Sequence, residues 1–120
     1  MTAIHPEDGE VAVALTQRMA SAAGSKVVVV AARHPLLDDR ADVEQRARRA
    51  AARLRAHKVD ARDVVRAGDL AAIVLDVAIE ERARLIVIGD LPGADATGRL
   101  LGEPWDHISR HAPCNVLVAR

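Results

Sequence analysis

Aromatic side chains are almost missing from this chain. Its 120 residues include no Phe and no Tyr, and Trp105 is the only Trp. Half of the residues are hydrophobic and many of these are Ala, so Val, Ile and Leu must build the core. A chain of this length is expected to bury roughly two thirds of the surface that its unfolded form exposes. We therefore expect one small domain over residues 1–120, packed closely through short side chains.

Cysteine and net charge are also scarce. Cys114 has no second cysteine to pair with and lacks the partner spacing of a zinc site, which agrees with a reducing compartment. His111 is close in sequence, but Pro113 separates the two and no acid stands in an obvious third position, so a nucleophilic pair is not predicted.

The 17 basic and 17 acidic residues cancel, so the chain lacks the field that attracts phosphate polymers and anionic membranes. We expect neither nucleic acid nor a membrane among its partners.

Long apolar runs are absent. No stretch approaches the roughly 20 apolar residues of a membrane span. The first nine residues include His5, Glu7 and Asp8 and no apolar run, which argues against a secretory signal. The sequence therefore predicts a cytoplasmic protein.

What the chain does contain is an alternation of short β-branched runs with longer segments of helical period. This alternation is typical of βαβ units around a parallel sheet. Two of the predicted strands contain unbroken stretches of Val and Ile, so helices should cover both faces of the sheet. The predicted strands are Lys26–Ala32, Asp60–Arg66, Leu85–Gly89 and Asn115–Ala119, with a shorter first strand at Thr2–His5.

The first predicted helix spans residues 9–23 and ends before Gly24, a residue suited to a helix C-cap. Its larger apolar residues recur at every fourth position. This spacing predicts an inner face made of Val11, Leu15 and Met19. The opposite face is predicted to carry Thr16, Gln17 and Arg18.

Three further helices are predicted. The second spans residues 41–57, the third follows Gly68 with Asp69 as its N-cap and runs to about Arg82, and the last begins at Pro104 and ends at Pro113. The many arginines of the second helix are expected to face solvent. The predicted inner faces consist, in chain order, of Val43, Ala47, Ala50 and Leu54; Leu70, Ile73, Val74, Val77 and Ala78; and Leu101, Trp105, Ile108 and Ala112.

Two segments carry a resemblance to a known family. Residues 65–90, VRAGDLAAIVLDVAIEERARLIVIGD, resemble the third strand, Gly-Asp turn, third helix and fourth strand of the universal stress protein family. Residues 99–120, RLLGEPWDHISRHAPCNVLVAR, resemble the same family's last helix, its His-Ala-Pro-Cys ending and its Val-rich final strand. The resemblance implies an α/β fold with an open, doubly wound parallel sheet of five strands in the order 3-2-1-4-5 and four helices. It also implies a frequent homodimer, and ATP binding in only one subgroup.

In that subgroup a loop of Gly, two residues, Gly, nine residues, Gly and then Ser or Thr holds the ribose and phosphates. Gly89 and Gly102 match the first and third glycines of this pattern. Pro92 stands at the second, where it has no N–H to donate and cannot adopt the conformations open to glycine. Gly93 could serve there only with a shift of one residue. The Asp that contacts adenine in the family has no clear counterpart, since Ile4 or His5 falls near its place.

The end of the same loop departs from the pattern as well. Glu103 replaces the hydroxyl residue, and Pro104 removes one more backbone donor. A helix N-terminus attracts an anion by about 0.3–1 kcal/mol, whereas two like charges about 4 Å apart near a surface repel by about 4 kcal/mol. Asp90 and Asp95 add negative charge against one Arg99, so unaided triphosphate binding is disfavoured. Two roles stay open for Glu103: complementing the helix dipole, or holding Mg²⁺ or Mn²⁺ together with Asp90.

The sequence therefore predicts a regulatory or binding module that is not an enzyme, has no catalytic residue and holds no resident metal or cofactor. It is expected to form a homodimer through its C-terminal strand and to bind an unidentified protein partner or a nucleotide. The alternative is a protein that binds ATP or AMP, assisted by Mg²⁺, with slow hydrolysis at most. A third option is a pocket reshaped for another small molecule at the carboxyl ends of the strands. The candidate binding residues, which form a degenerate nucleotide loop, are Gly89, Asp90, Gly93, Gly102 and Glu103.

Overall fold

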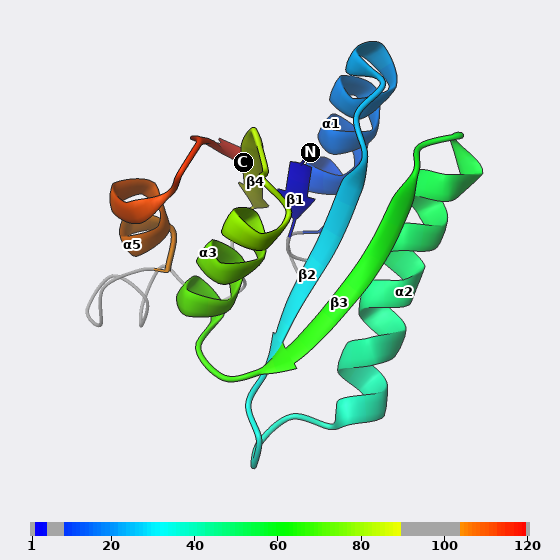
Figure 1. The fold of residues 1–120 in the computed structure, drawn as a ribbon. Coiled ribbons are helices and arrows are strands. Elements are labelled where there is room, and N and C mark those ends of the chain that lie inside the picture. The colour runs from blue at the N-terminus through cyan, green and yellow to red at the C-terminus, as the bar shows by residue number, and fades with distance from the viewer. Residues whose placement is uncertain (1, 5–8, 90–103, 120) are drawn as a thin grey trace.

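A computed structural model describes residues 2–4, 9–89 and 104–119 of the chain (Figure 1). Within these ranges five strands alternate with four helices, which confirms the expected α/β class and its four helices. The elements are β1 (Thr2–Ile4), α1 (Gly9–Ala23), β2 (Val27–Arg33), α2 (Arg40–Ala56), β3 (Ala61–Ala67), α3 (Leu70–Glu80), β4 (Leu85–Gly89), α5 (Pro104–His111) and β5 (Asn115–Ala119).

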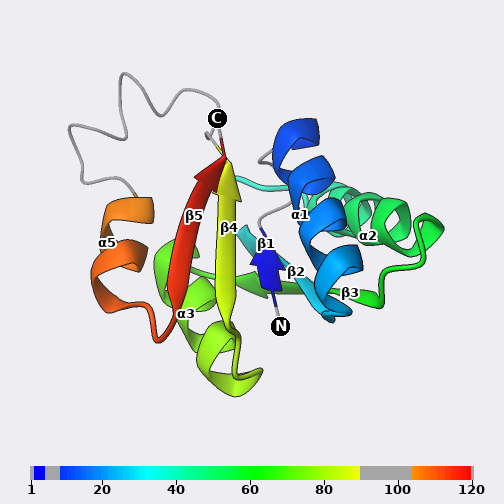
Figure 2. The same ribbon diagram turned by 90° about the horizontal axis from the view of Figure 1, so that it is seen from above.

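The strands are parallel and lie in the order β3-β2-β1-β4-β5. β1 has only three residues, yet it pairs with β2 on one side and with β4 on the other, as Figure 2 shows. Ile4, its last residue, lies beside Val29 of β2 and Val87 of β4. The fifth residue of the predicted first strand, His5, lies outside the described residues.

The run of four valines in β2 shows why helices cover both faces of the sheet. Val27 to Val30 are all buried, and successive side chains point to opposite faces. Val27 and Val29 belong to a core cluster with α1 and α2, whereas Val28 and Val30 belong to a second cluster with α3 and α5. β4 alternates in the same way, so each buried strand contributes to two cores. Figures 1 and 2 show the two helix layers on opposite sides of the sheet.

The predicted inner face of α1 is only partly right. The fully buried residues of this helix are Ala12, Val13, Thr16 and Ala20, whereas Leu15 and Met19 are half-buried. Thr16 was expected on the outer face and is 0% exposed, so that prediction was wrong. The short side chains at these positions let the helix backbone approach the sheet closely, and Leu15 packs at the margin of the core cluster.

The predicted cap at Asp69 is present, and Asp39, which the sequence interpretation did not single out, caps α2 in the same way. The Asp39 side chain accepts a hydrogen bond of 2.9 Å from the Ala41 amide at the start of α2, and Asp69 accepts one of 3.0 Å from Ala72 in α3. α3 ends at Glu80, earlier than the predicted Arg82, which adopts a positive φ of 51°. The predicted inner residues of α2 are all buried; those of α3 are buried except Leu70, which is half-buried, and in α5 Ile108 is buried.

Candidate functional site

The carboxyl ends of β1 and β4 meet near the centre of the sheet. Ile4, the last residue of β1, pairs with Val87 of β4, so β4 continues for two residues past the end of β1 and stops at Gly89. On its other side Gly89 pairs with Ala119 of β5. The chain winds from β1 to β2 on one side and returns to β4 on the other, so the winding direction changes between β1 and β4. Open α/β sheets bind ligands outside the carboxyl ends of the strands at this kind of switch point. The structure thus places Gly89, the first glycine of the predicted loop, at the expected edge.

Helix starts also lie at this edge. α1 follows β1 and begins at Gly9, and α5 begins at Pro104, which occupies the first helical position as predicted. The first N–H groups of a helix have no partner within the helix and are suited to bind anions. Pro104 contributes no such group, so α5 starts with one donor fewer. The remaining predicted residues of the loop, Asp90, Pro92, Gly93, Gly102 and Glu103, lie outside the described residues.

The loop from β2 to α2 is a further part of this edge, and the sequence interpretation missed it. The Nδ1 atom of His34 accepts hydrogen bonds from the backbone amides of Leu36 and Leu37, each 3.1 Å long. The His34 amide donates to Oδ2 of Asp38 at 2.7 Å, and the Asp38 amide donates to the His34 carbonyl at 3.2 Å. Four hydrogen bonds within five residues therefore hold this short loop in one shape.

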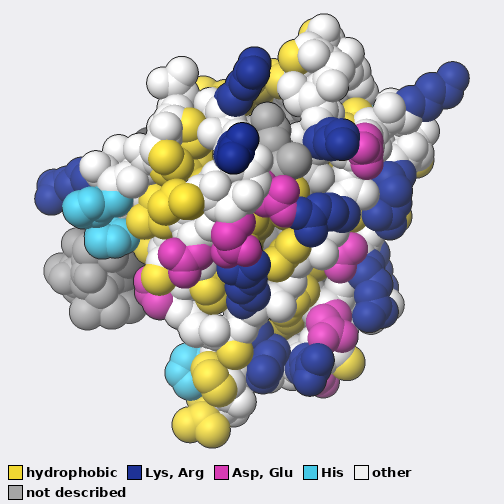
Figure 3. Space-filling model, viewed as in Figure 1, with side chains coloured by type: hydrophobic (Ala, Val, Ile, Leu, Met, Phe, Trp, Pro, Cys, Tyr) yellow, Lys and Arg dark blue, Asp and Glu magenta, His cyan; other side chains and the backbone are white. Residues whose placement is uncertain are grey.

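The same loop exposes two large apolar side chains. Leu36 is 89% exposed and Leu37 82%, and Figure 3 shows hydrophobic side chains beside a histidine at the lower tip of the molecule, where Figure 1 places the loop. Single exposed leucines are common on proteins, whereas here two exposed leucines are adjacent on one fixed turn. Pro35, Asp38 and Asp39 mark a turn in the sequence, and the two leucines between them were the signal that could have identified this surface.

The described aspartates of this edge already have structural partners. Asp38 accepts from the His34 amide, Asp39 from the Ala41 amide and Asp69 from the Ala72 amide. A carboxylate that caps a turn or a helix in this way is held by backbone donors and is not free to act as a general base. The described aspartates of this edge therefore serve to fix the turn and the starts of α2 and α3.

The universal stress protein family matches the chain over its full length, residues 1–120. The chain belongs to this family. The family that the segments at residues 65–90 and 99–120 indicated is thus confirmed. No protein with a curated description matches the chain.

Solved structures of universal stress proteins share the fold. A universal stress protein in complex with cAMP is 23% identical, with a TM-score of 0.81, and the match covers 100% of this chain and 96% of that one. A universal stress protein from Archaeoglobus fulgidus in complex with dAMP is 16% identical with a TM-score of 0.77, covering 99% and 96%. The protein UspA from Lactobacillus plantarum is 19% identical with a TM-score of 0.76, covering 99% and 97%.

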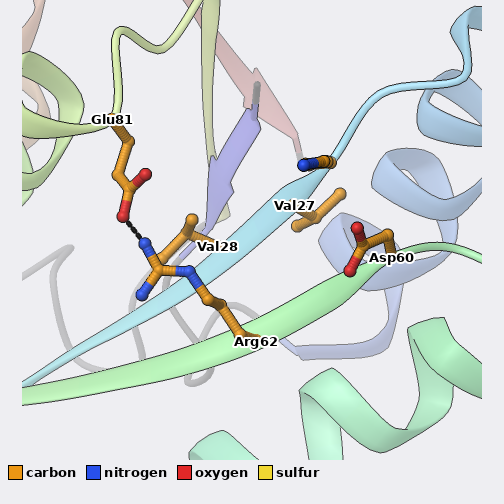
Figure 4. A pocket seen from close by; sticks show the side chains of 6 residues that line it. Val27, Val28, Asp60, Arg62 and Glu81 are labelled. Atoms are coloured by element: carbon orange, nitrogen blue, oxygen red, sulfur yellow. Dashed lines mark ion pairs between the residues drawn. The ribbon is translucent and has the colours of Figure 1, made fainter.

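The opposite, amino edge of the sheet of this universal stress protein contains a hollow of about 210 Å³. It lies where β2 and β3 begin and α3 ends. Figure 4 shows Glu81 extending from the end of α3 toward Arg62 of β3, with which it forms an ion pair. The residues that line the hollow are Lys26, Val27, Val28, Asp60, Arg62 and Glu81.

This hollow does not suit a nucleotide. Its volume lies below the roughly 300–1,000 Å³ of ordinary small-molecule sites. Its two basic and two acidic side chains cancel, so it offers no net attraction to a phosphate. It also lies at the amino ends of the strands, whereas the family resemblance and the switch point both indicate the carboxyl ends. We therefore assign the candidate site to the carboxyl edge.

The remaining reactive groups include one cysteine and the possible metal ligands of the described residues. Cys114 is half-buried, and burial raises the pKa of its thiol, which keeps it protonated and unreactive at neutral pH. Among the described residues no group of three or more His, Cys, Asp or Glu side chains is arranged to hold a metal ion. None of the described helices is both long and apolar enough to cross a membrane.

Proposed function

We propose that this universal stress protein is a homodimeric regulatory or binding module that does not catalyse a reaction and does not hold ATP. The observation that carries the proposal is the position of Pro104 as the first residue of α5. In the ATP-binding subgroup this helix start, which follows a Ser or Thr, belongs to the phosphate cradle. Here a proline opens the helix and Glu103 precedes it, so the cradle loses a hydroxyl and an amide donor and gains a negative charge.

An adenine monophosphate or a cyclic nucleotide is the second candidate ligand. Two structures that share the fold are complexes with cAMP and dAMP, and Gly89 lies at the switch point of the sheet. A monophosphate needs fewer donors than a triphosphate, so the substitutions at Pro92 and Glu103 weigh less against it. Mg²⁺ held by Asp90 and Glu103 would offset the remaining repulsion.

Isothermal titration calorimetry with ATP, AMP and cAMP, each with and without Mg²⁺, tests the ligand. We expect no ATP binding tighter than about 10 µM, which corresponds to about −7 kcal/mol. The matched variant Pro92→Gly/Glu103→Ser restores the glycine and the hydroxyl of the family pattern and is expected to gain affinity for ATP. Wild-type protein that binds ATP more tightly than this threshold would show that the loop functions as it stands.

The homodimer is supported by the edge position of β5. This strand pairs with β4 on one side and ends the sheet on the other. Unpaired backbone groups on an apolar edge strand favour pairing with a second strand, and a second copy of the same strand is the simplest partner. Asn115–Ala119 is apolar after its first residue, and the half-buried Val116 and Leu117 face opposite sides of the sheet.

Sedimentation velocity at micromolar concentration tests the dimer. We expect the wild-type protein to sediment as a dimer and the Leu117→Lys variant as a folded monomer, because a charged side chain on an edge strand opposes strand pairing. Circular dichroism shows whether the variant is folded. The matched control is Val64→Lys, which changes a half-buried valine on β3, the opposite edge of the sheet, and should leave the dimer intact. A wild-type monomer would contradict this part of the proposal.

A further inference from the structure

Two histidines of α5 lie one above the other. His107 and His111 are separated by one helical turn, and the centroids of their rings are 4.5 Å apart, with the planes tilted by 44°. Both side chains are exposed to solvent. Figure 3 shows histidine side chains gathered at the left-hand surface of the molecule, where Figure 1 places α5. The two rings therefore form one exposed pair on one face of the helix.

The surrounding contacts fix this face. Ile108, between the two histidines in sequence, is 1% exposed and belongs to the core cluster with α3, so α5 cannot rotate about its axis without losing that contact. Asp106 and Arg110 form an ion pair of 3.4 Å, also one turn apart. The Ala112 amide donates to the Ile108 carbonyl at 2.8 Å and continues the helical hydrogen bonding past His111. The imidazoles are thus presented to solvent from an anchored helix.

We propose that His107 and His111 together bind one divalent first-row transition ion, such as Zn²⁺, Ni²⁺ or Cu²⁺. Positions i and i+4 lie on the same face of a helix. Two nitrogens that each bind Zn²⁺ at about 2.0–2.1 Å in tetrahedral geometry lie about 3.4 Å apart, which rings with centroids 4.5 Å apart can provide. Imidazole is a preferred ligand of these three ions and a poor one for Mg²⁺ or Ca²⁺.

The described neighbours supply no third protein ligand. No group of three or more His, Cys, Asp or Glu side chains in the described part of the chain is arranged around one ion. The remaining coordination positions go to water. A site with two protein ligands and open positions exchanges its metal readily, which distinguishes it from a closed structural zinc site. Because α5 leads through residues 112–114 directly into β5, the bound ion stabilises the helix that precedes the edge strand.

Titration of ZnCl₂ into untagged protein, followed by isothermal titration calorimetry at about pH 7.5, tests the site. We expect one ion bound per chain, and affinity lowered by at least about tenfold in His111→Gln. The double variant His111→Gln/Ser109→His keeps the number of histidines but places them two residues apart, on different faces of the helix, and is expected to bind no better than His111→Gln. His57→Gln, which removes an exposed histidine at the end of α2, is the matched control and retains wild-type affinity.

Thermal unfolding gives a second readout. ZnCl₂ is expected to raise the Tm of the wild type and of His57→Gln, because an ion that binds only the folded chain stabilises it. The Tm of the single variant His111→Gln and of the double variant should be the same with and without ZnCl₂. The proposal is overturned if the wild-type Kd for Zn²⁺ is weaker than about 1 mM. It is equally overturned if the double variant binds as tightly as the wild type.

Discussion

Arg66 of β3 and Glu80 of α3 form a two-pronged ion pair across the sheet surface. The distances are 2.7 Å from Nη1 to Oε2 and 2.8 Å from Nη2 to Oε1. This geometry, in which two N–H groups meet two carboxylate oxygens, is the strongest arrangement of an Arg and an acid. Its side chains are 39% and 53% exposed, so solvent screens the pair. The next residue, Glu81, pairs with Arg62 of β3, and together the two pairs tie the end of α3 to β3.

The ion pair gives the stability of the protein a defined pH dependence. The hydrogen bond from Arg66 lowers the pKa of Glu80 below its ordinary value of 4.5. A lowered pKa in the folded state means that the pair stabilises the protein above pH 4.5, and that this contribution is lost as the pH falls toward the lowered pKa. We expect Glu80→Gln to have a lower Tm than the wild type at neutral pH.

The Tm difference between Glu80→Gln and the wild type should shrink in acid and in high salt, because acid protonates Glu80 and salt screens the exposed pair. Differential scanning calorimetry at several pH values measures it. Asp76→Asn, on the same helix, is the comparison: Asp76 acts on Arg66 only through its charge, without a hydrogen bond, so its replacement should change the Tm less than Glu80→Gln does. A difference that stays constant down to the lowest pH would show that Glu80 acts by something other than its charge.

Thr16 provides a stability test inside the core. Its hydroxyl is fully buried in α1 and has no hydrogen-bond partner among the described residues. A buried hydroxyl without a partner destabilises the folded state because it has lost its bonds to water. Thr16→Val replaces the hydroxyl by a methyl group of similar shape, and we expect a gain of about 1 kcal/mol in the free energy of unfolding.

Urea unfolding monitored by circular dichroism measures this gain. The control is Thr16→Ser, which keeps the hydroxyl but removes the methyl group, and it should lose about 1 kcal/mol through the small cavity that it leaves. If Thr16→Val unfolds at lower urea concentration than the wild type, the hydroxyl has a partner that contributes to stability.

Much of the fold could be predicted because its signals are local. β4 and β5 have the predicted bounds, since Leu85–Gly89 and Asn115–Ala119 are short β-branched runs with clear ends. β2 and β3 each begin one residue later than predicted. Thr16 was placed wrongly because apolar spacing identifies a helix but does not fix its rotation against the sheet. That rotation depends on which side chains are short enough for close packing, and here these are Ala12, Thr16 and Ala20.

The candidate site was predictable only where it follows a spacing. Gly89 matched the first glycine of the family pattern and Pro104 suited a first helical position, and the structure places them at the end of β4 and the start of α5. The loop after β2 has no such spacing, and its shape comes from the ring nitrogen of His34, which sequence periodicity does not reveal. The pairing of His107 with His111 is visible as an i and i+4 spacing, but the interpretation considered His111 only as a partner for Cys114.

Gly68 tests the connection between β3 and α3. Its φ is 134°, a conformation that L side chains rarely adopt, whereas the nearest atom to an added Cβ would be Cδ1 of Ile73 at an ordinary 3.6 Å. The strain of Gly68→Ala therefore comes from the backbone and not from a clash. We expect a loss of roughly 1–3 kcal/mol in the free energy of unfolding.

The comparison for Gly68→Ala is Gly24→Ala at the end of α1. Gly24 has a φ of 65°, in the left-handed region that other residues can occupy at a cost of about 1 kcal/mol, and an added Cβ would meet no atom within 4 Å. Gly24→Ala should thus be the milder of the two changes in urea unfolding. Equal losses would mean that the conformation of Gly68 is not held by the structure around it.

His34 decides the shape of the loop that presents Leu36 and Leu37 at the carboxyl edge. Since its Nδ1 accepts from both leucine amides, removing the ring leaves two donors without their partner. We expect His34→Ala to speed hydrogen exchange at Leu36 and Leu37 by about tenfold, equivalent to about 1.4 kcal/mol of local stability. Exchange in the strand core, at Val28 to Val30, should be unchanged.

The conservative variant His34→Asn separates the hydrogen bonds from the bulk of the ring. An asparagine oxygen can accept from amides two or three residues ahead, as in an Asx turn, so His34→Asn should restore part of the protection. His57→Ala, at the other end of α2, is the control and should leave the loop unchanged. If His34→Ala leaves exchange at Leu36 and Leu37 as slow as in the wild type, the turn is held by Asp38 and its backbone bonds alone. The two leucines would then be fixed at the carboxyl edge of the sheet without the histidine.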